Sequence, residues 1–201
     1  MTLLELLVVL AIIGLLASLI FPAFAQAKAR AREAVCTSNM RQVGMAVQAY
    51  ISDYHGLPPY LHRMLDTGHA AGDVLVCPSD PLADTMGYGE AFERVLRPPQ
   101  FQSQRPVSYL YWQVGSLANL NRLVTKKPGA GYTLCVLHGT LVSPAWSDPP
   151  SYQGRFVRLR PDGAVKRVQV SWEPRTHSCT ERYFTSEPCR SELRERGEPQ
   201  P

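Results

Sequence analysis

The chain has 201 residues, of which 45% are hydrophobic and 19% are charged, so its composition fits a folded domain with an appendage and argues against intrinsic disorder. The formal net charge is +4 and the basic residues are spread along the chain, so no specific nucleic-acid partner is indicated. Most of the 17 prolines lie beyond residue 57, which predicts a loop-rich distal part.

The first 24 residues form an apolar segment in which Glu5 is the only charged side chain. No charge follows between Leu6 and Phe24, a stretch close to the ~20 residues with which a helix crosses the hydrocarbon core of a bilayer. The segment can therefore span a membrane as a helix. Three interpretations of it differ in function.

Two of these interpretations are general. A secretory signal peptide would explain Ala23-Phe24-Ala25, which is similar to a small-x-small cleavage site, but not Glu5 or the lack of a basic region before the apolar run. A single-span membrane anchor would explain the hydrophobicity but not the acid, because a carboxylate well inside a bilayer costs about 2.5–3.5 kcal/mol or more. Such intramembrane carboxylates usually mark function.

The third interpretation rests on a resemblance. The stretch Met1-Thr2-Leu3-Leu4-Glu5-Leu6-Leu7-Val8-Val9 resembles the mature N-terminus of type IV pilins and type II secretion pseudopilins. In that family a leader peptide is cleaved just before the first residue, the new N-terminus is methylated, and a glutamate occupies the fifth position. The resemblance implies processing and methylation at Met1, and an assembly role for Glu5 paired with the α-amino group of Met1 in its own or a neighbouring subunit.

The resemblance thus implies a structural subunit, not an enzyme, that polymerises into an extracellular type IV pilus-like filament through its N-terminal hydrophobic helix. Its partners would be copies of itself, the inner membrane before assembly, and the pilus or secretion assembly machinery, without a cofactor. A type II secretion pseudopilin and a low-copy minor pilin or adhesin stay open as alternatives. The similarity is strong over residues 1–54 and faint over 55–80, where Val76-Cys77-Pro78-Ser79-Asp80 resembles a short motif of such proteins.

The helical pattern of residues 1–24, the membrane or filament-core helix, continues into an amphipathic half over residues 25–56. Steps of three and four place six side chains on one apolar face: Cys36, Met40, Val43, Val47, Tyr50 and Tyr54. Glu33 is expected to lie off that face. Gly56, Pro58 and Pro59 then provide a stop signal.

A weak point is expected within the apolar half. Pro22 cannot donate a hydrogen bond to the carbonyl of Ser18, and Gly14 lowers the helix propensity further. The Ser18 hydroxyl could offset part of the lost bonding. We predict a helix break within residues 14–22 when subunits pack into a filament, as in related pilins.

A globular head is expected over residues 57–190, followed by a polar tail over 191–201. Short helices are expected over residues 59–66 and 90–96, and strands over 107–114, 132–137, 155–160 and 164–171. Pro161-Asp162-Gly163 indicates a hairpin between the last two strands. The predicted fold class is α+β, with the long N-terminal helix packed against an antiparallel sheet.

The five cysteines suggest disulfide bonds if the head is exported. Cys179 and Cys189 are close enough in sequence to close a short loop, and are the first expected pair. Cys36 with Cys77 is the second, which leaves Cys135 free. No pair has C-x-x-C spacing, so a zinc site is not favoured and none is expected.

No catalytic residue is expected either. Cys135 and His138 could suggest a thiol nucleophile with its base, the basis of a remote alternative as a membrane-anchored thiol hydrolase. On a strand, however, positions three apart point to opposite faces. The five histidines lack metal-ligand spacing, and Asp80 with Asp84 gives an incomplete ligand set for calcium.

Overall fold

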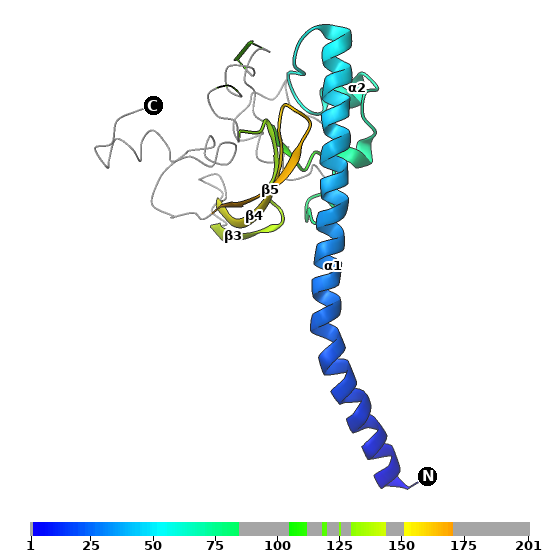
Figure 1. Cartoon of the computed structure of the whole chain (residues 1–201). Coiled ribbons are helices and arrows are strands. Elements are labelled where there is room, and N and C mark those ends of the chain that lie inside the picture. The colour runs from blue at the N-terminus through cyan, green and yellow to red at the C-terminus, as the bar shows by residue number, and fades with distance from the viewer. Residues whose placement is uncertain are drawn as a thin grey trace, which may run out of the picture.

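The computed structural model of the chain describes residues 2–84, 105–111, 118–119, 125, 130–143 and 151–170. Its main feature is α1, one uninterrupted helix of 52 residues from Leu3 to Tyr54. At 1.5 Å per residue this helix is about 78 Å long. It ends beside Gly56, as expected, because His55 adopts a left-handed φ of 54° and donates its N–H to the carbonyl of Ile51. Figure 1 shows α1 as a stalk with α2 and the strands of the head beside its C-terminal part.

The head begins with two short helical elements. The helix α2, Arg63–Asp66, is shorter than the predicted helix over residues 59–66. The 3-10 helix η1, Gly72–Leu75, was not predicted. The predicted helix over residues 90–96 lies outside the described residues.

The strands form one antiparallel sheet: β1 (Leu110–Tyr111), β2 (Thr133–Cys135), β3 (Gly139–Ser143), β4 (Ser151–Leu159) and β5 (Val165–Val170). The order is β1-β2-β4-β3, and β5 pairs with β4. On one edge of β4, β5 pairs along residues 154–159; on the other edge, β3 pairs along residues 151–154 and β2 along 157–159. The α+β prediction is confirmed, although β3 was not foreseen.

The β4–β5 hairpin forms at Pro161-Asp162-Gly163 as predicted. Gly163 takes a φ of 77°, and the Asp162 carboxylate accepts the N–H of Ala164 at 3.0 Å. Residues 156–159 of β4 are all buried, Arg158 among them, so both faces of this part of the strand are covered.

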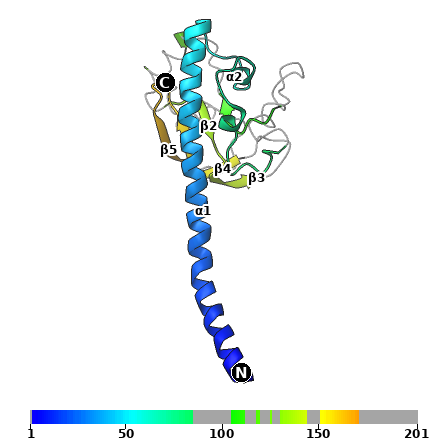
Figure 2. The same ribbon diagram turned by 90° about the vertical axis from the view of Figure 1, so that its right-hand side faces the viewer.

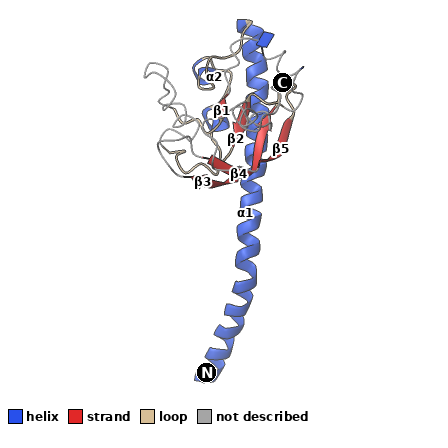
Figure 3. Cartoon of the chain, turned by 90° about the vertical axis from the view of Figure 1, so that its left-hand side faces the viewer, coloured by secondary structure: helices blue, strands red, loops and turns tan. Residues whose placement is uncertain are grey.

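The sheet packs against the C-terminal half of α1, as two opposite views show (Figure 2; Figure 3). The predicted apolar face of the helix is confirmed up to Tyr50, whereas Tyr54 is 54% exposed. Helix and sheet are in close contact at Gly44, where an added Cβ would lie 3.1 Å from Leu159 Cδ1, so a larger residue there would require the Leu159 side chain to shift.

The sequence predicted that Glu33 lies off the buried face of α1, but in the structure it lies on that face. The residue is 5% exposed, and its carboxylate is an ion-pair partner of two arginines. Arg167 Nε lies 2.8 Å from Oε1, and Arg155 Nη1 lies 3.6 Å from Oε2. Arg155 and Arg167 are diagonal neighbours on one face of the β4–β5 pair. These two ion pairs connect α1 with strands β4 and β5.

Candidate functional site

The N-terminal half of α1 is an uncovered apolar surface. Every large apolar side chain from Leu3 to Phe24 is exposed, and the first buried residue of the helix is Glu33. An 18-residue stretch of this helix has a mean hydropathy of 2.8, and none of its residues is buried. By length and composition α1 is therefore able to cross a membrane, a property that a signal sequence shares.

Glu5 has a local partner that the sequence analysis did not consider. Thr2 is the N-cap of α1, and the two residues form a capping box. Thr2 N–H donates to Glu5 Oε2 at 2.7 Å, and Glu5 N–H donates to Thr2 Oγ1 at 3.3 Å. The Thr-x-x-Glu spacing is the sequence signal that could have revealed this pair. Met1, the other predicted assembly and processing residue, lies outside the described residues.

The predicted break residues Gly14, Ser18 and Pro22 all lie inside the continuous helix of the single chain. Figure 1 shows that α1 curves along its N-terminal half. The Ser18 hydroxyl donates to the carbonyl of Leu15 at 2.7 Å, and so does not occupy the place of the N–H that Pro22 lacks. The predicted break concerns the assembled filament and stays a prediction.

Deep between α1 and the sheet, four side chains with metal-binding atoms come together. They are Cys36 on α1, Cys77 after η1, Cys135 at the end of β2, and His138 just before β3. Their sulfur and nitrogen atoms all lie within 4.8 Å of one another, and Cys77 Sγ lies 3.5 Å from His138 Nε2. The three cysteines are buried free thiols. The second expected disulfide partners, Cys36 and Cys77, thus do meet, but together with Cys135 and His138.

The turn between β2 and β3, across which the N–H of Gly139 donates to the carbonyl of Val136 at 2.9 Å, brings Cys135 and His138 to the same place. β2 and β3 follow one another along the same edge of β4, and Cys135 pairs with Val157 whereas Gly139 pairs with Gly154. This edge therefore holds one residue more than β4 does, and residues 136–138 leave the ladder. The extra residue reverses the alternation of a regular strand. The expectation that the two side chains point to opposite faces was wrong for this reason.

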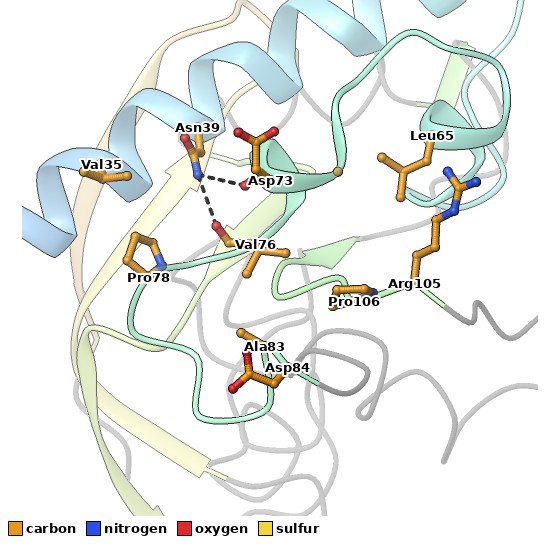
Figure 4. Close-up of a pocket in the computed structure, with 11 residues that line it drawn as sticks. Val35, Asn39, Leu65, Asp73, Val76, Pro78, Ala83, Asp84, Arg105 and Pro106 are labelled. Atoms are coloured by element: carbon orange, nitrogen blue, oxygen red, sulfur yellow. Dashed lines mark hydrogen bonds between the residues drawn. The ribbon is translucent and has the colours of Figure 1, made fainter.

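The segment before Cys77 is held against the helix by side-chain hydrogen bonds (Figure 4). Asn39, one turn after Cys36, donates its Nδ2 to the carbonyls of Val76 at 3.1 Å and Asp73 at 3.4 Å. The Tyr109 hydroxyl donates to the same Val76 carbonyl at 3.4 Å. The backbone position of Cys77 is thereby set from both α1 and the residues before β1.

The surroundings shift the pKa values of the thiols in this cluster in different directions. Burial raises the pKa of Cys135 well above its ordinary value. The pKa of Cys77 is lowered, chiefly by hydrogen bonds from the thiols of Cys135 and Cys36, and also by His138 and by the N–H of Ser79 at 3.5 Å.

The other candidate residues do not converge in this way. Cys179 and Cys189 lie outside the described residues. Asp80 is buried and its Oδ1 accepts the N–H of Leu82 at 2.8 Å, as in a local turn. Asp84 lines a groove of about 570 Å³ beside Asn39 (Figure 4). Within the described part of the chain, the cysteine–histidine cluster is the one group of three or more possible metal ligands.

Comparison with known proteins gives one result. The model of a protein family of unknown function, DUF1559, matches residues 25–73, from the middle of α1 to the start of η1. This family is typical of prepilin-like bacterial proteins. Neither the curated proteins nor the solved structures contain a match to the chain. The family match and the exposed apolar helix are together compatible with a pilin-like surface subunit.

Proposed function

We propose that this chain is a pilin-like structural subunit that polymerises into an extracellular filament through the apolar half of α1, with its head on the outside. The observation that carries the proposal is the complete exposure of that half in the single chain. Copies of the chain, the inner membrane before assembly and an assembly machinery are the partners. A secretion pseudopilin and a low-copy minor pilin would use the same helix, and copy number per cell distinguishes them.

An apolar surface of this size needs a cover. From Leu3 to Phe24 the helix is about 33 Å long, close to the ~30 Å hydrocarbon thickness of a bilayer. Each large apolar side chain that leaves water contributes about 1.5–3 kcal/mol. A bilayer provides this cover for the subunit pool, and neighbouring copies of the same helix provide it in a filament.

Glu5 favours polymerisation over a plain anchor. The capping box accounts for one oxygen of its carboxylate and places the acid at the positive end of the helix. The negative charge itself still needs compensation when the first turn is buried among apolar helices. A cationic N-terminus of a neighbouring copy would supply it.

The capping box allows these two roles of Glu5 to be tested separately. Glu5→Gln retains a capping-box side chain but removes the charge, whereas Thr2→Ala removes the cap but keeps the charge. Because breaking a buried charge pair costs about 3–5 kcal/mol, we expect Glu5→Gln to reduce subunit docking by more than about 100-fold. Thr2→Ala should cost about 1 kcal/mol of helix stability and still assemble.

The readout is electron microscopy of native surface material, together with membrane fractionation of each variant. We expect helical filaments for the unmodified chain and membrane-inserted, folded monomers for Glu5→Gln. Wild-type filament yield from Glu5→Gln would make Glu5 a helix cap without an assembly role. A native monomer or closed dimer of the unmodified chain would overturn the proposed function.

A further inference from the structure

We propose that Cys36, Cys77, Cys135 and His138 bind one Zn²⁺ ion as a structural site between α1 and the head. The four ligand atoms come from α1, from the segment after η1 and from the end of β2 with the turn that follows it, and they all lie within 4.8 Å of one another. This inference is independent of the filament proposal, because it concerns residues 36–138 and not the apolar half of α1.

The spacing fits one tetrahedral ion. With Zn–S of about 2.3 Å and Zn–N of about 2.0–2.1 Å, tetrahedral geometry places a sulfur and a nitrogen ligand about 3.6 Å apart and two sulfurs about 3.8 Å apart. Cys77 Sγ and His138 Nε2 are separated by 3.5 Å. The other pairs lie within 4.8 Å, so small side-chain rotations complete the coordination.

The donor chemistry selects the ion. Thiolates and imidazole are soft or intermediate ligands that favour zinc over magnesium or calcium, which prefer oxygen. Three cysteines and one histidine form a closed set, which is typical of structural and not of catalytic zinc. On binding, the three thiols release their protons to solvent and the site carries one net negative charge. The N–H of Ser79, directed at Cys77 Sγ, helps to stabilise that charge.

The fold supports the ligands as a metal site requires. The turn at residues 136–138, closed by the hydrogen bond from the N–H of Gly139 to the carbonyl of Val136, brings His138 toward Cys135. Asn39 and Tyr109 both bind the carbonyl of Val76, and so fix the residue next to Cys77. These contacts position the ligands without contributing a donor atom to the ion.

A zinc ion here would cross-link the layers of the protein. Cys36 belongs to the stalk helix, Cys77 to the segment after η1, and Cys135 with His138 to the sheet. Three neighbouring thiols without an ion would be prone to form a disulfide in an oxidising compartment, with one thiol left over. Bound as thiolates to zinc, all three have a defined partner.

The test uses the full chain purified in mild detergent after growth with added zinc, followed by extensive exchange into zinc-free buffer. Elemental analysis should find about one zinc per chain, the stoichiometry of a closed mononuclear site. Replacing zinc by Co²⁺ should give the visible absorption of tetrahedral cobalt with thiolate charge-transfer bands. Both measurements are made on the unmodified chain, so they do not depend on whether a variant folds.

Variants locate the site. His138→Gln should weaken zinc binding by at least about 100-fold, since loss of even a supporting group costs 10–100-fold. His62→Gln, at a histidine outside the cluster, is the matched control and should retain the metal. Absence of zinc and of the cobalt spectrum would overturn the proposal, as would peptide mapping that finds two of the three cysteines in a disulfide. Equal zinc loss in both histidine variants would also overturn it.

Discussion

The ion pair of Glu33 with Arg155 and Arg167 leads to an asymmetric prediction. The Glu33 side chain is 6% exposed, whereas the two arginine side chains are 60% and 61% exposed. Removing the carboxylate leaves two cations that water can hydrate. Removing both arginines leaves a buried carboxylate without the two cations that the described residues place beside it. The second change should therefore be the more damaging, although both abolish the same ion pairs.

The magnitudes follow from this exposure. The Arg167 N–H is not aligned on Glu33 Oε1 despite the 2.8 Å separation, so the attraction is mainly Coulombic. We expect Glu33→Gln to cost about 1 kcal/mol, at the upper end for ion pairs with exposed partners. The double variant Arg155→Gln/Arg167→Gln should cost about 3 kcal/mol, as for a buried charge that has lost its partners. For a chain of this size these values lower Tm by about 2–4 °C and about 6–12 °C.

Thermal unfolding of the full chain in mild detergent, followed by near-UV circular dichroism, measures both changes. The informative control is the triple variant that combines Glu33→Gln with both arginine substitutions. It removes the stranded carboxylate, so it should be more stable than the double variant by about 1–2 kcal/mol. Additive losses in the triple variant would refute the reasoning, because they would show that Glu33 is not held as a buried anion.

Two further predictions concern backbone contacts of the head. Gly131→Ala should destabilise the head by about 1–3 kcal/mol, because an added Cβ would lie 2.6 Å from the backbone carbonyl of Leu159. Gly72→Ala is the control, because its added Cβ meets nothing within 4 Å, and it should be nearly neutral in the same unfolding assay. Equal effects of the two substitutions would contradict this. Asn39→Ala should cost about 1–2 kcal/mol and speed amide exchange in residues 73–80, because the carbonyls of Asp73 and Val76 each lose one of their donors. The exposed Gln42→Ala should leave that exchange unchanged. Unaltered exchange in Asn39→Ala would show that other contacts hold this segment.

The features predicted best from the sequence are those with local signals. The apolar face of α1 repeats every three to four residues, and the β4–β5 hairpin is set by the turn residues Pro161-Asp162-Gly163. Two other local signals match features of the structure that were not predicted. Thr2 and Glu5 have capping-box spacing, and Glu33 precedes Cys36 by three residues, which places it on the buried face.

The cysteine–histidine cluster could not be predicted in the same way. Its members come from a helix, a loop and a strand end, so their proximity depends on how the sheet packs on α1 and not on sequence spacing. The turn at residues 136–138 also has no strong signature in the residues themselves. A one-residue change in register decides whether Cys135 and His138 meet or point apart.

The way in which the head is joined to α1 has a mechanical consequence. Buried contacts extend from Glu33 to Tyr50, over about 25 Å of helix, and residues 2–32 continue about 45 Å beyond them. A pull between the free end of α1 and the sheet would load these attachments in shear along the helix axis. Glu33, nearest to the free end, would carry load first, and the thiols lie one turn further along. Salt screens charges that water reaches, as it reaches Arg155 and Arg167, so the force at which the head begins to slip should fall with ionic strength, while the final rupture force should not.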